Sequence, residues 1–269
     1  MKEASCNNSE IENMGMLQGK VAIVTGASSG IGYAAAKLFA REDASVVVTA
    51  RREGALSDLV QEILSAGGKA VAVAGDVRDE TLARTLVDTA VGRFGGLDIA
   101  FNNAGGVGEM GPVSGVSLEG WREAIDTNLT SAFLGAKYQV PAMVDRGGGS
   151  IIFTSTFVGH TAGMPGMAAY AASKAGLIGL TQVLAAEYGP RNVRVNTVIP
   201  GGTDTPSNVA NSPDASPELV SFVKSLHALK RLATPDEIAR AVLFLASDAS
   251  AFVTGSALAA DGGLAITRT

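Results

Sequence analysis

Short apolar runs alternate with longer segments of helical period along this chain, and that alternation constrains the fold more than any other feature. The runs cover Val21–Thr25, Ser45–Thr49, Ala70–Ala74, Leu97–Phe101, Ser150–Thr154, Val193–Val198 and Ala257–Ala260. They are mostly continuous Val, Ile and Ala, which is typical of strands buried on both faces. Helices between such strands cover both faces of a parallel sheet. The sequence therefore predicts an α/β protein with a doubly wound parallel sheet of about seven strands.

The length of the chain favours a single domain. Its 269 residues are close to the size of many single α/β domains, which run to roughly 250 residues. Residues 1–16 are polar and lack a periodic pattern, so we expect a disordered leader followed by one domain over residues 17–269. Residues 202–217 are rich in Thr, Asp, Asn, Ser and Pro, which predicts a mobile loop and then a short helix over about residues 202–227.

Composition and charge argue against several classes of function. No stretch approaches the roughly 18 apolar residues of a membrane span, and the first residues lack a signal-peptide pattern, so we expect a cytoplasmic protein. The net charge is -5 without runs of Lys or Arg, so neither nucleic acid nor a membrane is expected as a partner. With Cys6 as the one cysteine and only His160 and His227 as histidines, neither an intrachain disulfide nor a Cys/His zinc site can form. No metal is expected.

A glycine-rich turn joins the first apolar run to a helix expected to begin near Ile31. Gly26 permits a tight turn, and Gly30 and Gly32 leave room for a pyrophosphate at the helix N-terminus. The expected cofactor contacts in this turn come from Gly26, Ser28, Ser29, Gly30, Ile31 and Gly32. Because the spacing is not the common Gly-x-Gly-x-x-Gly fingerprint, a glycine-rich turn without a ligand is the alternative.

The same residues also form the pattern Gly26-x-Ser28-x-Gly30, which is the nucleophile elbow of α/β hydrolases. That fold needs an earlier strand to supply part of the oxyanion hole, and no segment before Val21 is a strand candidate. A hydrolase that uses Ser28 is therefore a remote alternative.

The end of the second apolar run bears on the choice of nucleotide. An enzyme selective for NAD is expected to place a carboxylate there, about 20 residues after the glycines. The chain has Ala50 instead, and Arg51 could pair with a 2'-phosphate and stack on adenine. NADP(H) is therefore favoured over NAD(H). Alternatively, Arg51 and Arg52 are ordinary solvated residues at the start of a helix, with Glu53 neutralising one of them.

Several further motifs follow in order along the chain. They are Asp76-Val77, Asn102-Asn103-Ala104-Gly105, Asn128, Tyr170-x-x-x-Lys174, Pro200-Gly201 with Thr205, and Asp261-Gly262-Gly263. Together with the glycine turn, their order and spacing make the chain resemble a classical short-chain dehydrogenase/reductase from about Leu17 to Gly263. The resemblance implies a Rossmann-type fold in which the single domain binds a dinucleotide and carries the catalytic residues.

The resemblance also implies roles for individual residues. The expected contacts on the adenosine side come from Asp76, Val77, Asn102, Ala104 and Gly105. Pro200, Gly201 and Thr205 would contact the cofactor near the nicotinamide. Asn128 resembles the family residue at a helix kink that orders a water beside the catalytic lysine, although a plain asparagine on a helix surface is the alternative.

Tyr170 and Lys174 are one helical turn apart, so on the helix predicted from Ala168 to Tyr188 they share a face. A phenol has a pKa near ~10, and both a neighbouring ammonium and an oxidised nicotinamide favour its ionised form. Tyr170 is then the expected acid/base, beside a cofactor that carries the redox step and that both side chains contact. A tyrosine and a lysine that merely face solvent are the alternative.

The fifth apolar run departs from the family pattern, which usually ends in two serines of which the second binds the substrate oxygen. This chain has Ser155 and Thr156, and counting back from Gly159 places Thr156 in the catalytic position. The threonine hydroxyl can donate the same hydrogen bond. Ser155 should point to the other face of a regular strand, but the following loop is one residue longer than usual, so a bulge could exchange the two roles.

The sequence therefore predicts an oxidoreductase that transfers a hydride between NADP(H) and a secondary alcohol or ketone, with residues 202–227 next to the substrate. A catalytically idle dinucleotide-binding sensor or scaffold is the alternative, because a nucleotide cradle ensures binding and not turnover. A small diffusible substrate is favoured over an acyl carrier protein, since the basic residues are scattered among acidic ones. The Ala- and Gly-rich helix that carries Tyr170 favours a contact across a two-fold axis, and the resemblance implies a homotetramer.

Overall fold

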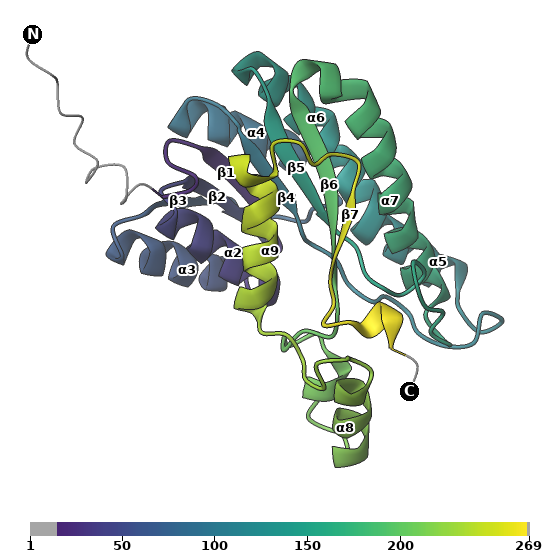
Figure 1. The fold of residues 1–269 in the computed structure, drawn as a ribbon. Helices are drawn as coiled ribbons and strands as arrows, with labels where there is room; N and C mark the ends of the chain where they lie inside the picture. The colour runs from purple at the N-terminus through teal and green to yellow at the C-terminus, as the bar shows by residue number, and fades with distance from the viewer. Residues whose placement is uncertain (1–14, 268–269) are drawn as a thin grey trace, which may run out of the picture.

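The computed structural model describes residues 15–267, which form a sheet between two layers of helices (Figure 1). All strands of the sheet pair in parallel, in the order β3-β2-β1-β4-β5-β6-β7. They are β1 (Val21–Thr25), β2 (Ser45–Thr49), β3 (Lys69–Ala72), β4 (Ile99–Asn102), β5 (Gly149–Thr154), β6 (Val193–Pro200) and β7 (Ala257–Ala260). The predicted single-domain, doubly wound sheet is confirmed.

The limits of four strands differ from those predicted. β3 and β4 are shifted by one or two residues, β5 begins one residue earlier, and β6 continues to Pro200. Asp98 explains why β4 begins later than predicted. Its backbone N–H donates to the carbonyl oxygen of Val21 at 2.9 Å, and its carboxylate accepts from the Val21 N–H at 2.8 Å. Because a side chain makes the second bond, the regular ladder begins only after Asp98.

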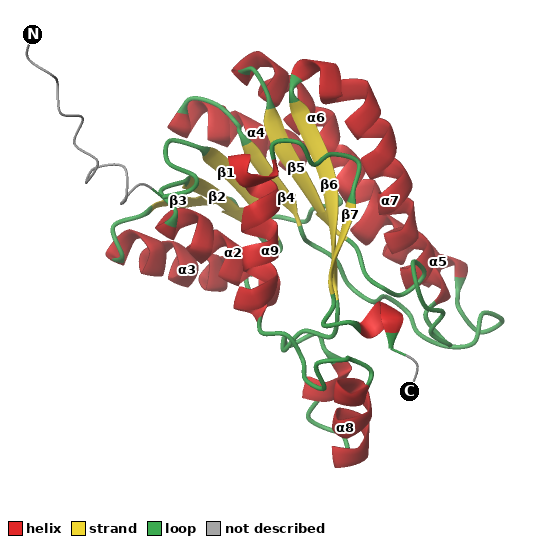
Figure 2. Cartoon of the chain, viewed as in Figure 1, coloured by secondary structure: helices red, strands yellow, loops and turns green. Residues whose placement is uncertain are grey.

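Three helices cover each face of the sheet (Figure 2). On one face lie α2 (Gly30–Arg41), α3 (Glu53–Ser65) and α9 (Pro235–Ala246), and on the other lie α4 (Glu80–Phe94), α6 (Ser131–Arg146) and α7 (Ala168–Tyr188). An apolar cluster that includes Phe39 and Ile238 fills the first interface, and one that includes Leu86 and Phe153 fills the second. The central strands are therefore buried on both faces, which explains why their sequences do not alternate.

The remaining elements lie around the carboxyl ends of the strands. α5 (Leu118–Ile125) runs through the π-helical turn η1 (Asp126–Thr130) into α6, and it packs beside α7. α8 (Pro217–Ser225) stands apart from the layers, beyond this edge of the sheet, and contains no buried residue (Figure 1). The turns η2 (Gly189–Arg191), η3 (Val209–Asn211), η4 (Asp248–Ser250) and η5 (Leu264–Ile266) are short 3-10 helices.

The predicted leader falls outside the described residues apart from its last two, and so does Cys6. The backbone N–H of Gly15 donates to the Asp43 carboxylate at 3.1 Å, and that of Met16 donates to the Glu42 carboxylate at 2.8 Å. Within residues 15–267, no helix is both long enough and apolar enough to cross a bilayer.

Candidate active site

The predicted site lies at the carboxyl edge of the sheet, where the strand order reverses between β1 and β4. Thr25 ends β1, and its Oγ1 accepts hydrogen bonds from the backbone N–H groups of Asn103 and Ala104, both at 2.9 Å. The glycine turn and the turn after β4 are thereby joined at one point. A ligand that binds at this edge can contact both turns.

Each of the three glycines in the turn lies too close to neighbouring atoms to carry a side chain without a shift. A Cβ on Gly32 would overlap the carbonyl oxygen of Gly26, and a Cβ on Gly26 would lie 2.9 Å from the Ala104 Cα. A Cβ on Gly30 would lie 3.0 Å from the Thr205 Cγ2. No side chain caps the N-terminus of α2, so its first N–H groups are available to an anion. These features fit the pyrophosphate of a dinucleotide.

Arg52 rather than Arg51 contacts this turn. Its Nη2 donates to the carbonyl oxygen and to the Oγ of Ser28, at 3.3 and 3.0 Å. Arg51 is exposed and lies near enough to Asp76 to contribute to the lowered pKa of that carboxyl. Arg52 was expected only as a solvated residue, although its place directly after Arg51 was a signal for the same role.

Asp76 holds a second arginine that the sequence analysis did not find. The Arg78 Nη2 donates to Asp76 Oδ2 at 2.7 Å, and the Arg78 backbone N–H donates to Oδ1 at 3.0 Å. The hydrogen bond from the Arg78 side chain is the main cause of the lowered pKa of Asp76. Asp76 is therefore a fixed anion, with Val77 beside it at the edge where adenosine is expected.

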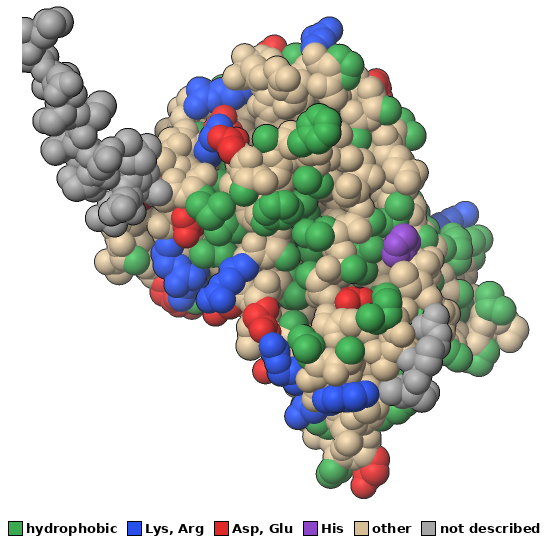
Figure 3. Space-filling model, viewed as in Figure 1, with side chains coloured by type: hydrophobic (Ala, Val, Ile, Leu, Met, Phe, Trp, Pro, Cys, Tyr) green, Lys and Arg blue, Asp and Glu red, His purple; other side chains and the backbone are tan. Residues whose placement is uncertain are grey.

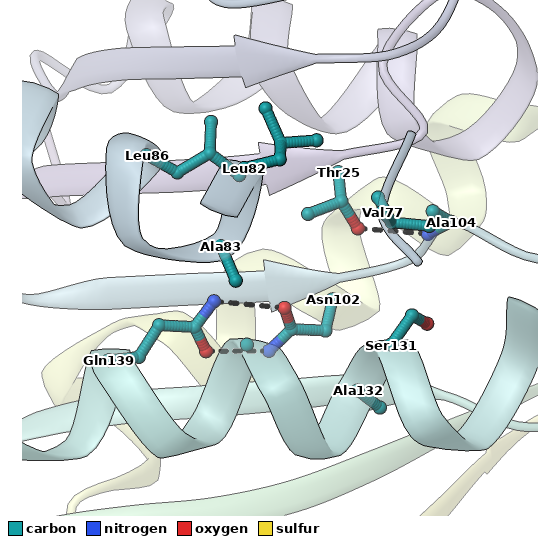
Figure 4. Close-up of a pocket in the computed structure, with 11 residues that line it drawn as sticks. Thr25, Val77, Leu82, Ala83, Leu86, Asn102, Ala104, Ser131, Ala132 and Gln139 are labelled. Atoms are coloured by element: carbon teal, nitrogen blue, oxygen red, sulfur yellow. Dashed lines mark hydrogen bonds between the residues drawn. The ribbon is translucent and has the colours of Figure 1, made fainter. Parts of the chain in front are cut away.

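The side chain of Asn102 points toward α6 (Figure 4). Its amide and that of Gln139 exchange two hydrogen bonds of 2.8 and 3.0 Å, and both residues are buried. A cavity of about 20 Å³ lies beside the pair and is lined also by Val77 and Ala104. Both ends of the Asn102 amide are thus engaged by protein, so a cofactor contact at this position falls to the backbone of the turn.

Asn128 lies in η1, and its side chain joins three segments. The Nδ2 donates to the Gly106 carbonyl oxygen at 2.9 Å and to the Ser173 Oγ at 3.0 Å, while the Oδ1 accepts from the Gly106 N–H at 2.9 Å. The π-helical turn breaks the regular helix between α5 and α6 at this residue. Asn128 was a sequence-based candidate, whereas its partners Gly106 and Ser173 were not, because only the fold brings them near it.

Tyr170 and Lys174 lie on the first turns of α7, which begins at Ala168 as predicted. Lys174 is buried, and its Nζ donates to the carbonyl oxygen of Thr154 at 2.8 Å. A Cβ on Gly105 would lie 2.9 Å from this Nζ and 2.6 Å from the Asn128 Oδ1, so the three residues meet. Burial lowers the pKa of Lys174 to about 8.

The electrostatics of Tyr170 differ from the sequence-based expectation. Burial raises the pKa of Tyr170, and a hydrogen bond with the Thr156 side chain acts in the opposite direction. Burial disfavours the charged form of both Tyr170 and Lys174. Burial therefore favours the protonated phenol of Tyr170 over the phenolate.

Ser155 and Thr156 follow β5 and have different partners. The Ser155 Oγ donates to the backbone carbonyl oxygen of Lys174 at 2.8 Å and is buried. The Thr156 side chain instead contacts the Tyr170 phenol, and its Oγ1 accepts from the Val158 N–H at 3.3 Å. Of the two hydroxyls, Thr156 is the one beside the expected acid/base.

The segment after β6 brings the remaining predicted cofactor residues to the same edge. Gly201 follows Pro200, and a Cβ on it would lie 2.7 Å from the carbonyl oxygen of Asp261. Thr205 lies against Gly30, so this segment approaches the glycine turn. The predicted phosphate-side and nicotinamide-side residues therefore border one site, whereas His160 is exposed in the loop after β5.

Comparison with known proteins finds relatives along most of the chain. Residues 26–265 match the family model described as enoyl-(acyl carrier protein) reductase. The chain is 42% identical over 243 residues to the cyclohexanol dehydrogenase of Acinetobacter sp. (strain SE19), which covers 90% of this chain and 94% of that protein. It is 41% identical over 252 residues to the 2,5-dichloro-2,5-cyclohexadiene-1,4-diol dehydrogenase of Sphingobium indicum, which covers 93% and 98%.

Three solved structures share the fold and about a third of the sequence. A short-chain type dehydrogenase/reductase from Mycobacterium marinum superposes with a TM-score of 0.87 at 37% identity, over 93% of this chain and 97% of that one. Carveol dehydrogenase from Mycobacterium avium, in complex with NAD, gives 0.89 at 31% identity, over 94% and 100%. A protein assigned as an NAD(P)-dependent gluconate 5-dehydrogenase from Beutenbergia cavernae, with bound NADP, gives 0.86 at 36% identity, over 93% and 98%.

Proposed function

The chain belongs to the short-chain dehydrogenase/reductase family and is an NAD(P)-dependent dehydrogenase acting on CH–OH groups, and we propose that it interconverts small cyclic secondary alcohols and their ketones. The proposal is carried by two contacts where β5 ends: the Tyr170 side chain is hydrogen-bonded to that of Thr156, and the Lys174 Nζ donates to the Thr154 carbonyl oxygen. The ring-shaped substrates are suggested by relatives named for cyclohexanol and carveol.

In the proposed mechanism a nicotinamide cofactor, held by the glycine turn, would supply the hydride chemistry, and the residues of this chain position the substrate and move the proton. Tyr170 protonates the substrate oxygen during reduction and takes the hydroxyl proton during oxidation. The Thr156 hydroxyl donates a hydrogen bond to the same oxygen, in the place of the family's second serine. Lys174 is held by the Thr154 carbonyl and keeps positive charge beside the site.

The Tyr170→Phe variant tests this mechanism. With cyclohexanol as the probe, we expect kcat to fall by about 10²–10⁴-fold, because the variant lacks the group that transfers the proton. NADP+ affinity should stay within about threefold of wild type, since the glycine turn and its contacts are unchanged. The matched control is Tyr188→Phe, the same substitution near the far end of α7, which should retain full activity. An unchanged turnover rate in Tyr170→Phe would disprove the proposed chemistry.

We also propose that the enzyme prefers NADP(H) to NAD(H). The two arginines after β2 and the absence of a carboxylate at Ala50 support this preference. Loss of a charge-assisted bond to the 2'-phosphate corresponds to roughly tenfold or more in affinity. We expect Arg51→Ala and Arg52→Ala each to lower kcat/KM for NADP+ by that factor without changing it for NAD+. A wild-type enzyme that uses NAD+ more efficiently would reverse this assignment.

Two alternatives from the sequence analysis are set aside. The Ser28 hydrolase is wrong, because the chain belongs to a dehydrogenase family, and the Ser28 hydroxyl accepts a hydrogen bond from Arg52. The idle sensor or scaffold does not agree with membership among dehydrogenases that act on CH–OH groups. Turnover of simple esters without nicotinamide would reopen the first alternative, and nucleotide binding without turnover on any alcohol would reopen the second.

We propose a small diffusible substrate and a homotetrameric assembly in the cytoplasm. On the face drawn in Figure 3, Lys and Arg side chains lie among Asp and Glu, which offers an acyl carrier protein no uniform basic surface. Phe133 on α6 and Val183 on α7 are half exposed or more, at 50% and 62%, on the helices expected to meet a second copy. A measured mass of a single chain in dilute solution would contradict the tetramer.

A further inference from the structure

His227 is a buried, titratable side chain that the proposed mechanism does not use. It lies after α8 and is only 1% exposed. Its Nε2 accepts a hydrogen bond from the backbone N–H of Gly202 at 2.8 Å, and its Nδ1 lies 3.1 Å from the carbonyl oxygen of Val223. Because a backbone N–H can only donate, Nε2 must be the acceptor and Nδ1 must carry the proton. Both ring nitrogens are thus hydrogen-bonded to the backbone, one at Gly202 and one at Val223 in α8.

The bond to Gly202 closes residues 202–227, called here the substrate segment, at its base, and the bond to Val223 fixes the ring against the end of α8. The backbone adds further ties there: the Ala233 N–H donates to the Gly202 carbonyl oxygen at 2.9 Å, and the Asp204 N–H donates to the Ala233 carbonyl oxygen at 2.8 Å. Within the segment, α8 contains no buried residue. The position of α8 therefore depends on the connections at the base far more than on packing against the core.

The same base carries residues proposed to contact the cofactor. Gly202 directly follows Gly201, and three residues later Thr205 lies against Gly30 of the glycine turn. The His227 ring also packs against Gly202 closely, since a Cβ on Gly202 would lie 2.9 Å from the His227 Cε1. A displacement of the His227 ring would therefore move the backbone of residues 201–205, which is proposed to contact the cofactor near its nicotinamide and its phosphates.

We propose that His227 is a positioning residue that clasps the two ends of the substrate segment and so aligns α8 with the Gly201–Thr205 backbone. The inference rests on the proposed function, because it concerns the placement of that site's substrate. His227 itself does not touch the reacting atoms. His227 holds the substrate segment in the conformation that binds the alcohol.

The proposal is tested with a pair of variants at one position. His227→Leu removes both hydrogen bonds and leaves the Gly202 N–H without a partner, whereas the amide oxygen of His227→Gln can still accept from it. We expect His227→Leu to raise the KM for cyclohexanol at least tenfold while kcat falls less than threefold. Amide hydrogen exchange should accelerate at least tenfold within residues 203–226 and stay unchanged in α4. His227→Gln should restore KM and exchange to within threefold of wild type.

A control separates positioning from general loss of stability. Ser150→Ala removes another buried bond from a side chain to a carbonyl oxygen, at the opposite edge of the sheet, and should lower Tm without changing KM or the exchange of residues 203–226. If His227→Leu behaves like this control, or if His227→Gln is no better than His227→Leu, the proposal is overturned.

A variant on the other side of the contact covers the case in which His227→Leu does not fold. Gly202→Ala keeps the histidine but forces its ring to shift, so it should also raise KM and accelerate exchange in the segment; an unchanged KM and exchange rate would count against the clasp. If wild-type enzyme fails to oxidise cyclohexanol at all, the proposed function fails, whereas the exchange measurements still decide the role of His227.

Discussion

The glycine turn after β1 and helix α8 stand at the same edge of the sheet but are held there in opposite ways. Around the glycine turn, buried strands and close backbone contacts fix each residue, and an added Cβ on Gly26 or Gly32 has no room. α8 contains no buried residue, and the segment that carries it is closed at its base by a few hydrogen bonds. The nucleotide end is thus part of the core, whereas the substrate end is carried outside it.

Because the nucleotide end is fixed by the core and the substrate end lies outside it, the same fold can keep its chemistry while the residues that bind the substrate change. Regions with few buried contacts open at low free-energy cost and accept changes of sequence, whereas core regions open only with the whole domain. We therefore expect substitutions at the nucleotide end to affect stability and cofactor binding together. Substitutions on α8 should affect substrate affinity alone.

The largest effect is expected from Gly32→Ala. The new Cβ would overlap the Gly26 carbonyl oxygen, so the turn must move, which should abolish detectable NADP+ binding and lower the free energy of unfolding by about 1–3 kcal/mol. Nucleotide titration and urea unfolding measure the two effects. Gly92→Ala in α4 is the matched control: nothing lies within 4 Å of its Cβ, so it should bind NADP+ normally and be slightly stabilised. Normal NADP+ binding by Gly32→Ala would show that close contacts do not fix the glycine turn, so that it would not differ from α8 in this respect.

The next effect concerns the neighbouring hydroxyls after β5. Thr156→Ala should lower kcat by about 10²-fold or more, as is typical when a donor to the reacting oxygen is lost. Ser155→Ala should instead lower the free energy of unfolding by about 1 kcal/mol, because it removes a buried bond to the Lys174 carbonyl, and it should largely retain activity. Turnover and urea unfolding of both variants decide the matter. A severe loss of turnover in Ser155→Ala alone would exchange their roles.

A pH-dependent effect of intermediate size is expected from Lys174, which is buried like the nucleotide end. Its pKa falls from 10.5 to about 8 on folding. Below about pH 8 the ammonium is charged in both states and its burial penalty is fully present; the penalty disappears as pH rises toward 10.5, because the unfolded chain holds the proton longer. Lys174→Met lacks this penalty at every pH. The free energy of unfolding of the variant minus that of wild type should therefore decrease by about 3 kcal/mol as pH rises from 8 to 10.5.

Urea unfolding of both proteins at several pH values measures the difference. The raised pKa of Tyr170 opposes stability only above about pH 10 and is common to both proteins, so it largely cancels. A stability difference that stays constant from pH 8 to 10.5 would mean that Lys174 is not desolvated in the native protein.

The smallest effect is expected on α8. Phe222 is 55% exposed, so Phe222→Ala should raise the KM for cyclohexanol by about two- to fivefold and leave the free energy of unfolding within about 0.5 kcal/mol of wild type. Leu64→Ala in α3, with 45% exposure and a place away from the site, is the control and should change neither quantity. A large loss of stability in Phe222→Ala would show that α8 belongs to the core after all.

The sequence alone predicted the sheet and most of the positions that border the site. The limits of β1, β2 and β7 and those of α7 agree with the apolar runs and the helical period, because these patterns repeat within a single element. The helical spacing of Tyr170 and Lys174 likewise required no knowledge of the rest of the chain. Strand limits were less exact where side chains take part in pairing, as Asp98 does at the start of β4.

Other features of the site could not be predicted, because they join residues far apart in the chain. Arg52 reaches Ser28 across 24 positions, Asn102 meets Gln139 across 37, and Gly202 meets His227 across 25. The sequence could not show that the Lys174 Nζ would bond to the Thr154 carbonyl oxygen, or that burial would raise the pKa of Tyr170.

Local sequence therefore determined which elements form and which residue types reach the edge of the sheet, since hydrophobic period and turn chemistry act over a few neighbouring residues. The packed fold set which of two adjacent arginines contacts Ser28, which of two adjacent hydroxyls contacts Tyr170, and what each buried polar group bonds to. A buried donor or acceptor needs a hydrogen-bond partner within about 3 Å. The whole fold sets which group lies at that distance.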